Sequence, residues 1–138
     1  MTRITNHIYT ARVHTTGGRE GSSRTDDGRL DVKLTAPGAP GSGTNPEQLF
    51  AAGWSACFIA ALQVAGKELS IAVPRDVAVD AEIDLGTNDE GYLLGARLNV
   101  SLPGLDADVA RKLVEAAHQT CPYSKATRGN IAVELIVA

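Results

Sequence analysis

Aromatic side chains are scarce in this sequence, since only 4% of its 138 residues are Phe, Trp or Tyr. Because 43% of the residues are nevertheless hydrophobic, Ala, Val, Leu and Ile must fill the core of a globular fold. Basic residues form no cluster and the net charge is −3, which excludes nucleic-acid binding through a positive surface. By its length the chain is one domain, and we expect residues 1–138 to fold as a single domain.

The motifs of metal and nucleotide chemistry are also missing. The histidines His7, His14 and His118 form no cluster with the spacing of metal ligands. The sequence contains no Gly-x-Gly-x-x-Gly or phosphate-binding loop and no Gly-x-Ser-x-Gly turn. We therefore expect neither a bound metal nor a cofactor.

One long uncharged hydrophobic stretch is present, at residues 49–66. It is rich in Ala and contains Ser55 and Gln63, so we interpret it as a buried helix rather than a membrane span. The first six residues are polar and do not resemble a signal peptide, and no basic amphipathic helix suggests a membrane surface. We expect a cytoplasmic protein, in which the two cysteines are free thiols or a redox pair rather than a structural disulfide.

The hydrophobic pattern predicts an α+β fold. Alternating hydrophobic and polar residues predict strands at residues 7–16, 30–35, 77–86, 92–102 and 131–137. Asp27-Gly28 is typical of a hairpin turn. Helices are predicted at residues 45–67 and 106–119, and the first has good initiating residues in Asn45 and Pro46. Because that first helix is hydrophobic almost all round, we expect a partner subunit to cover part of it.

Cys57 lies in the middle of this first helix. A thiol in hydrophobic surroundings is an inert packing residue unless a nearby cation lowers its pKa. Arg19 and Arg128, which lie in Gly-containing turns, are candidates for that cation. The other cysteine, Cys121, follows 64 positions later, and this spacing does not show whether the thiols meet. Packing and redox chemistry both remain open from these residues alone.

Glu47, in the first turn of the helix, also has two interpretations. Its charge stabilises a helix N-terminus, or it orients an arginine beside a thiolate. Ten residues of straight helix would separate Glu47 from Cys57 by about 15 Å. If both serve one site, either the helix bends near Gly53 or a second subunit contributes, and we favour a dimer.

Several segments in order along the chain carry a family resemblance. They are residues 9–11, 17–21, 26–28, 44–53, 56–58, 121–124 and 126–130. Together they resemble the organic hydroperoxide resistance (Ohr) family of the Ohr/OsmC superfamily. Residues 45–50 and 121–124 are similar to the Ohr branch rather than the OsmC branch, whereas Trp54 and Lys125 depart from the pattern.

The resemblance implies a thiol peroxidase that reduces organic hydroperoxides. By its match to the family motifs, Cys57 is the peroxidatic cysteine and Cys121 the resolving cysteine. Arg19 matches the arginine that holds Cys57 as a thiolate, and Glu47 the carboxylate that orients this arginine. The implied fold is an OsmC-like intertwined homodimer, with antiparallel sheets wrapped around central helices.

The resemblance also implies a reductant, either a lipoylated protein or dihydrolipoamide. Hydrophobic neighbours of the thiol would bind the substrate and favour alkyl or fatty-acid hydroperoxides, namely Leu49, Phe50, Trp54 and Phe58. Three alternatives remain: an OsmC-like peroxidase with a broader preference for peroxides, a redox sensor that uses the cysteines as a switch, and a structural protein with inert thiols.

Overall fold

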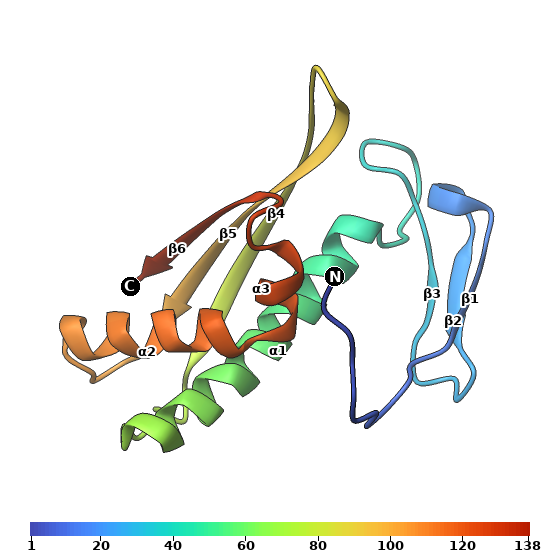
Figure 1. Ribbon diagram of the computed structural model, residues 1–138. Coiled ribbons are helices and arrows are strands. Elements are labelled where there is room, and N and C mark those ends of the chain that lie inside the picture. Colours follow the sequence, from blue (N-terminus) through green and yellow to red (C-terminus); the bar gives the residue numbers. More distant parts are fainter. The chain divides into compact units, whose positions relative to one another are not determined.

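The computed structural model describes residues 1–138, and the chain divides into two compact units, Met1–Pro46 and Glu47–Ala138. The first unit is a three-stranded antiparallel sheet with the order β1-β2-β3 (Figure 1). Its elements are β1 (Val13–Thr16), the short 3-10 helix η1 (Gly18–Glu20), β2 (Ser22–Thr25) and β3 (Asp31–Lys33).

The predicted Asp27-Gly28 turn joins β2 to β3. Gly28 has a φ of 72°, a left-handed conformation that glycine adopts without strain. The Asp27 carboxylate accepts hydrogen bonds from the Arg29 backbone N–H at 3.0 Å and from the Thr25 hydroxyl at 2.7 Å. These local bonds close the turn, and the hairpin prediction is confirmed.

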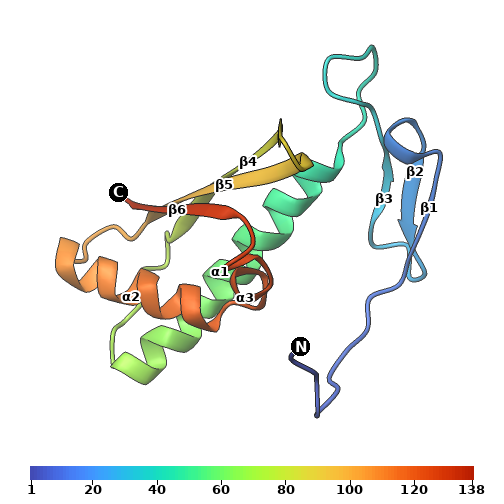
Figure 2. The same cartoon turned by 45° about the horizontal axis from the view of Figure 1, so that its top comes forward.

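The second unit places three helices against a three-stranded sheet. Figure 2 shows the sheet nearly edge-on, with all three helices on the same side of it. The helices are α1 (Pro46–Leu69), α2 (Ala107–Thr120) and α3 (Pro122–Thr127), and the strands are β4 (Ala78–Asn88), β5 (Gly91–Ser101) and β6 (Ala132–Val137). Both long helices and all three strands fall where the hydrophobic pattern predicts them, and the α+β class is confirmed.

This sheet is mixed rather than antiparallel. Strands β4 and β5 form the predicted antiparallel hairpin, but β6 pairs with β5 in the parallel direction. Parallel neighbours require a long crossover connection, and here α2 and α3 provide it. The expected antiparallel arrangement therefore holds for the first unit and for β4 and β5, and β6 is the exception.

The core of the second unit lies between the helices and the inner face of the sheet. Along β5, Ala96, Leu98 and Val100 are buried there, while Arg97 and Asn99 point to the opposite face. Burying each large hydrophobic side chain contributes roughly 1.5–3 kcal/mol. The helices contribute mainly small and aliphatic residues with two aromatic ones, namely Trp54, Phe58, Ala61, Leu62, Ala65, Ala110, Leu113, Val114 and Ala117.

The outer face of the sheet is held by an ion-pair group. The Arg97 guanidinium donates to both carboxylate oxygens of Asp84, at 2.7 and 2.9 Å, and to Glu82 at 3.1 Å. This Arg97 contact holds the pKa of Asp84 below its ordinary value. Because the carboxylates of this group are exposed to solvent, its contribution to stability is small.

The structure differs from the sequence prediction in three places: one strand is shorter than expected, and one strand and one short helix are additional. The strand expected at residues 7–16 forms only from Val13 to Thr16, since no strand of this chain pairs with residues 7–12. Strand β2 was not predicted, because its sequence Ser-Ser-Arg-Thr has no hydrophobic alternation. Helix α3 was not predicted either, since its six residues are too few for a helical pattern.

Candidate active site

The two cysteines, 64 positions apart in sequence, lie in contact. The Sγ atom of Cys121 donates a hydrogen bond to the Sγ atom of Cys57 at 3.4 Å, and both thiols are free. Cys57 is half-buried on α1, whereas Cys121 has 0% of its surface exposed. The structure thus places the residues predicted as peroxidatic and resolving cysteines side by side, and after oxidation of one sulfur only a short approach of the two would be needed to form a disulfide.

Cys121 is the corner between α2 and α3. Its backbone is extended, with φ −62° and ψ 123°, and its N–H donates to the carbonyl of Ala117 at 2.8 Å. Pro122 then starts α3, where its lack of an N–H costs nothing. The carbonyl of Cys121 accepts from the N–H of Lys125 at 2.9 Å. These bonds at the end of one helix and the start of the next fix the backbone that carries the thiol.

Side chains of α1 and α3 pack together beside the thiols. The indole N–H of Trp54 donates to the hydroxyl of Ser124 at 3.2 Å, and both side chains are fully buried. Phe50 makes edge contacts with Trp54 and with Tyr123, at ring-centroid distances of 5.8 and 6.0 Å. A Cβ on Gly53 would lie 2.9 Å from the Tyr123 hydroxyl oxygen, so the glycine leaves room for this tyrosine against α1.

The surroundings of Cys57 within its unit disfavour the thiolate. Burial raises the pKa of the Cys57 thiol most, and the hydrogen bond with the adjacent Cys121 raises it further, with a smaller contribution from charge repulsion between the sulfurs. The backbone N–H of Tyr123 acts in the opposite direction and lowers the pKa of Cys57. A reactive thiolate at neutral pH therefore requires a positive charge in addition to these groups.

Arg19, the predicted source of that charge, lies in the first unit. It is half-buried in η1, at the end of the hairpin formed by β1 and β2. Gly17 precedes it with a φ of 73°, and a Cβ on Gly21 would clash with the carbonyl of Thr16, so the loop needs both glycines. The predicted role of Arg19 beside Cys57 stays a prediction.

Glu47 lies half-buried in the first turn of α1. Helix α1 continues without interruption through Gly53 to Cys57, so the rise between Glu47 and Cys57 is about 15 Å. Any influence of this carboxylate on the thiol must therefore pass through another group. Its predicted role in orienting Arg19 also stays a prediction.

The four predicted substrate-binding residues fall into two pairs. Leu49 and Phe50 are half-buried and have surface to offer a substrate. Trp54 and Phe58 are fully buried in the core. The substrate role of all four stays a prediction, and for the buried pair it would require a change of conformation.

Sequence reasoning assigned no role to Tyr123 or Ser124. Both follow Cys121 on α3 and contact residues of α1 close to Cys57. In the sequence, only their position directly after Cys121-Pro122 indicated that they lie near the site. The structure shows which residues they contact.

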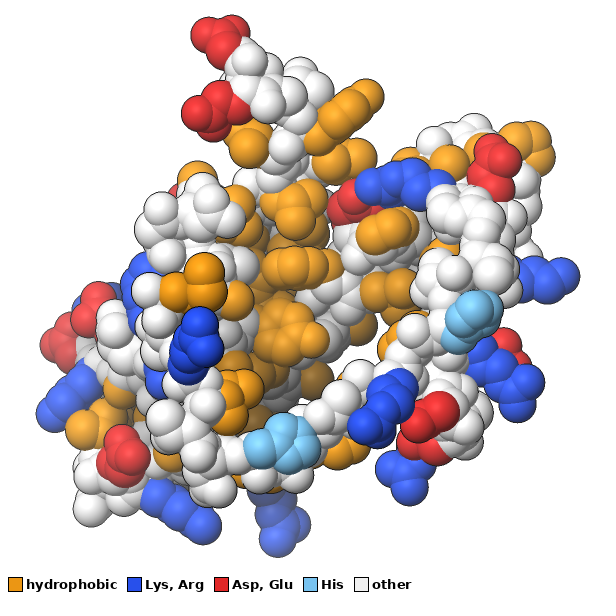
Figure 3. Space-filling model, turned by 45° about the vertical axis from the view of Figure 1, so that its right-hand side comes forward, with side chains coloured by type: hydrophobic (Ala, Val, Ile, Leu, Met, Phe, Trp, Pro, Cys, Tyr) orange, Lys and Arg blue, Asp and Glu red, His pale blue; other side chains and the backbone are white.

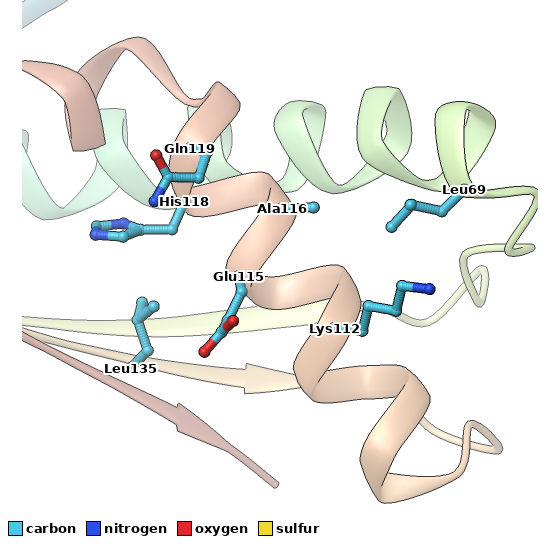
Figure 4. Close-up of a pocket in the computed structure, with 7 residues that line it drawn as sticks. All are labelled: Leu69, Lys112, Glu115, Ala116, His118, Gln119 and Leu135. Carbon is cyan, nitrogen blue, oxygen red and sulfur yellow. The ribbon is translucent and has the colours of Figure 1, made fainter.

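A separate pocket of about 490 Å³ lies beside α2 (Figure 4). The side chains that line it are Leu69, Lys112, Glu115, Ala116, His118, Gln119 and Leu135. Neither thiol lines this pocket, so it is distinct from the cysteine pair. No group of three or more His, Cys, Asp or Glu side chains is placed to hold a metal ion.

His118, at the edge of that pocket, predicts a pH effect on stability. Its Nδ1 atom is buried without a hydrogen-bond partner, and burial together with the charge of Arg128 lowers the pKa of His118. The unfolded chain then binds more protons than the folded one around the ordinary His pKa of about 6.5. The free energy of unfolding should therefore decrease as the pH falls through this range.

Urea unfolding at pH 7.5 and 5.5 measures this effect. The variant His118→Gln should lose part of the decrease, whereas Gln119→Ala, a change at the neighbouring position, should keep it. An identical pH dependence in His118→Gln and the wild-type protein would contradict the assignment to His118.

The α+β fold and its cysteine pair agree with comparisons to known proteins. Residues 38–136 match the family of OsmC-like proteins. The organic hydroperoxide resistance protein of Xanthomonas axonopodis pv. citri is 45% identical over 135 residues, which cover 95% of each chain. The chain therefore belongs to the organic hydroperoxide resistance (Ohr) proteins of the OsmC-like family, and the resemblance found in the sequence is confirmed.

Two solved structures agree with this assignment. The structure of OhrB from Bacillus subtilis is 44% identical with a TM-score of 0.89, and the match covers 94% of this chain and 98% of that one. The structure of an organic hydroperoxide resistance protein from Legionella pneumophila is 41% identical with a TM-score of 0.90, covering 96% and 99% of the two chains. The fold of this chain is that of the Ohr proteins.

Proposed function

We propose that this protein reduces organic hydroperoxides to alcohols, with Cys57 as the nucleophile. The observation that carries the proposal is the 3.4 Å contact between the Cys57 and Cys121 sulfurs, which supplies both a nucleophile and a second thiol to resolve it. Membership of the Ohr proteins supports a role in peroxide resistance. An inert packing role would not require two thiols in contact.

The first step consumes the peroxide. The Cys57 thiolate attacks the distal oxygen of the hydroperoxide, so that an S–O bond forms and the O–O bond breaks. The sulfur is oxidised by two electrons to a sulfenic acid, and the alkoxide takes a proton and leaves as the alcohol. Arg19 would hold Cys57 as a thiolate by a charge-assisted hydrogen bond and stabilise the charge on the leaving oxygen, and Glu47 would orient Arg19.

The second step protects the oxidised sulfur. The sulfur of Cys121 attacks the Cys57 sulfenic acid, an S–S bond forms, and the hydroxyl leaves as water. An external dithiol then restores both thiols by two exchanges and is itself oxidised to a disulfide. We assign the dithiol to the lipoyl type, either dihydrolipoamide or a lipoylated protein.

The hydrophobic surroundings of Cys57 favour organic hydroperoxides as substrates. Leu49 and Phe50 lie half-buried on the helix that carries the thiol and offer hydrophobic surface to an alkyl chain. Hydrogen peroxide gains nothing from such surface. We therefore propose alkyl or fatty-acid hydroperoxides as the substrate class.

A homodimer is part of this proposal. By length and composition alone, helix α1 could span a membrane. Within the chain, however, only 33% of its most hydrophobic 18-residue window is buried. A helix in the core of a dimer meets the same criteria. Its exposed residues include Ala52, Ala56, Ala60 and Val64, which is 46% exposed. A second copy of the chain that covers this face would explain its composition.

Other exposed hydrophobic side chains support the same assembly. Figure 3 shows hydrophobic side chains along the hairpin of β4 and β5, below its acidic tip. They include Leu85, Leu93 and Tyr92, which is 81% exposed. We also propose that the protein is cytoplasmic and that residues 1–138 of each subunit function as a single domain.

A steady-state assay tests the proposed function. With dihydrolipoamide as reductant, kcat/KM for cumene hydroperoxide should exceed that for hydrogen peroxide at least about tenfold, since burying a few methylene groups supplies more than 1.4 kcal/mol. Glutathione should support much slower turnover. Stoichiometric oxidation without turnover would indicate a redox sensor instead, and equal efficiency with the two peroxides would refute the proposed substrate class.

A further inference from the structure

The buried hydrogen bond between Trp54 and Ser124 lies beside the two thiols, and neither of its side chains reacts in the proposed chemistry. An indole N–H buried in a core needs an acceptor, and the Ser124 hydroxyl accepts it at 3.2 Å. Both side chains are fully buried, so this contact belongs to the packed interior rather than to a surface that binds substrate.

Each residue of this hydrogen bond is three positions away from one of the two cysteines. Trp54 lies three residues before Cys57 on α1, and Ser124 lies three residues after Cys121 at the start of α3. Residues three apart lie on the same face of a helix. The Trp54–Ser124 bond and the Cys57–Cys121 contact are therefore neighbouring bridges between the same two segments.

Helix α3 depends on such bridges for its position. It has only six residues, too few to be a stable helix by itself, so its tertiary contacts must place it. The ring contact of Tyr123 with Phe50 and the directional hydrogen bond from Trp54 to Ser124 both tie α3 to α1. Whatever places α3 also places the sulfur of Cys121.

We infer that Trp54 and Ser124 are positioning residues for the resolving step, an inference that rests on the proposed function. Their hydrogen bond holds the Cys121 sulfur beside Cys57, so that the sulfenic acid becomes a disulfide before a second peroxide can oxidise it further. Trp54, predicted from sequence as a substrate-binding residue, would then act on the second step of the cycle and not on the first.

The variants Ser124→Ala and Trp54→Phe test this role by separating the two steps. After one equivalent of cumene hydroperoxide, quenching and mass spectrometry give the rates of sulfenic acid and of disulfide formation. Ser124→Ala should leave the rate of sulfenic acid formation within about twofold, and both variants should slow disulfide formation about tenfold, because a directional bond is lost at the resolving thiol. The double variant should be no slower than either single variant.

A matched control removes a hydroxyl from the same helix without touching α1. The Thr127 hydroxyl is buried and donates to the carbonyls of Tyr123 and Ser124, within α3 itself. Thr127→Val should therefore leave disulfide formation at the wild-type rate. If Ser124→Ala and Trp54→Phe lower the melting temperature but keep the wild-type rate, their contact is only structural and the inference is wrong.

A measurement without peroxide keeps this test independent of the proposed function. Equilibration of the reduced protein with mixtures of reduced and oxidised dithiothreitol gives the equilibrium constant of the Cys57–Cys121 disulfide. Each variant should shift that constant about tenfold towards the dithiol, which corresponds to about 30 mV. An unshifted constant would overturn the positioning role, whereas a wild-type protein that forms this disulfide but reacts with no hydroperoxide would overturn only the proposed function.

Discussion

Replacing Cys57 by serine is expected to abolish peroxide turnover, with kcat/KM reduced about a thousandfold or more, as for other enzymes that lose their nucleophile. A serine hydroxyl stays protonated at neutral pH and does not attack the O–O bond, whereas a thiolate does. The measurement is consumption of cumene hydroperoxide with dihydrolipoamide as reductant. Residual turnover near the wild-type rate would show that Cys57 is not the nucleophile.

Cys121→Ser is the matched variant, because it also removes a sulfur from the 3.4 Å contact. It should still react once with the hydroperoxide, but the product should accumulate as sulfenic acid or as more highly oxidised Cys57. Mass spectrometry distinguishes these species from a disulfide. Normal turnover of Cys121→Ser with a dithiol would remove its resolving role while leaving the role of Cys57 intact.

Replacing Arg19 by alanine is expected to raise the pKa of Cys57. Burial and Cys121 already act in that direction, since both disfavour the charged sulfur, and the Tyr123 N–H opposes them. Loss of the compensating cation should therefore reduce the thiolate fraction at pH 7 about tenfold or more. The rate of alkylation of Cys57 as a function of pH, measured in a Cys121→Ser background, gives this value directly.

Two further variants sharpen that experiment. Arg19→Lys keeps the charge but loses the planar pair of donors. The pKa of Cys57 in this variant should therefore lie between its values in the wild-type protein and in Arg19→Ala. Arg24→Ala removes an exposed arginine of β2 that lies near Asp31, and it should leave the alkylation profile unchanged. An unchanged profile in Arg19→Ala would move the assignment to Arg24 or Arg128.

Much of the fold was predictable because its elements follow a hydrophobic period. The alternation along β4 and β5 and the long hydrophobic run of α1 reflect burial on one face or on most faces. The Asp27-Gly28 turn was predictable for a different reason, since few residue pairs adopt that backbone conformation. In each case the cause is local, and a local pattern records it.

The features that escaped prediction are set by tertiary contacts. Strand β2 has no hydrophobic pattern and is held by its two neighbouring strands and by a hydrogen bond of 2.8 Å between Thr15 and Ser23. The direction of β6 depends on where the chain emerges from α3, which no residue of β6 encodes. The same holds for the candidate site, because the contact of Cys57 with Cys121 depends on how α3 packs on α1.

In the proposed cycle, the enclosure of Cys121 would determine which sulfur the reductant attacks. Once the disulfide has formed, only the Cys57 sulfur can meet an incoming dithiol, because the Cys121 sulfur is fully enclosed by the protein. The mixed disulfide with the reductant must then form on Cys57, and Cys121 must be the leaving group. In the proposed cycle the hydroperoxide and the reductant would therefore react in turn at the Cys57 sulfur, so we expect steady-state kinetics of the ping-pong type.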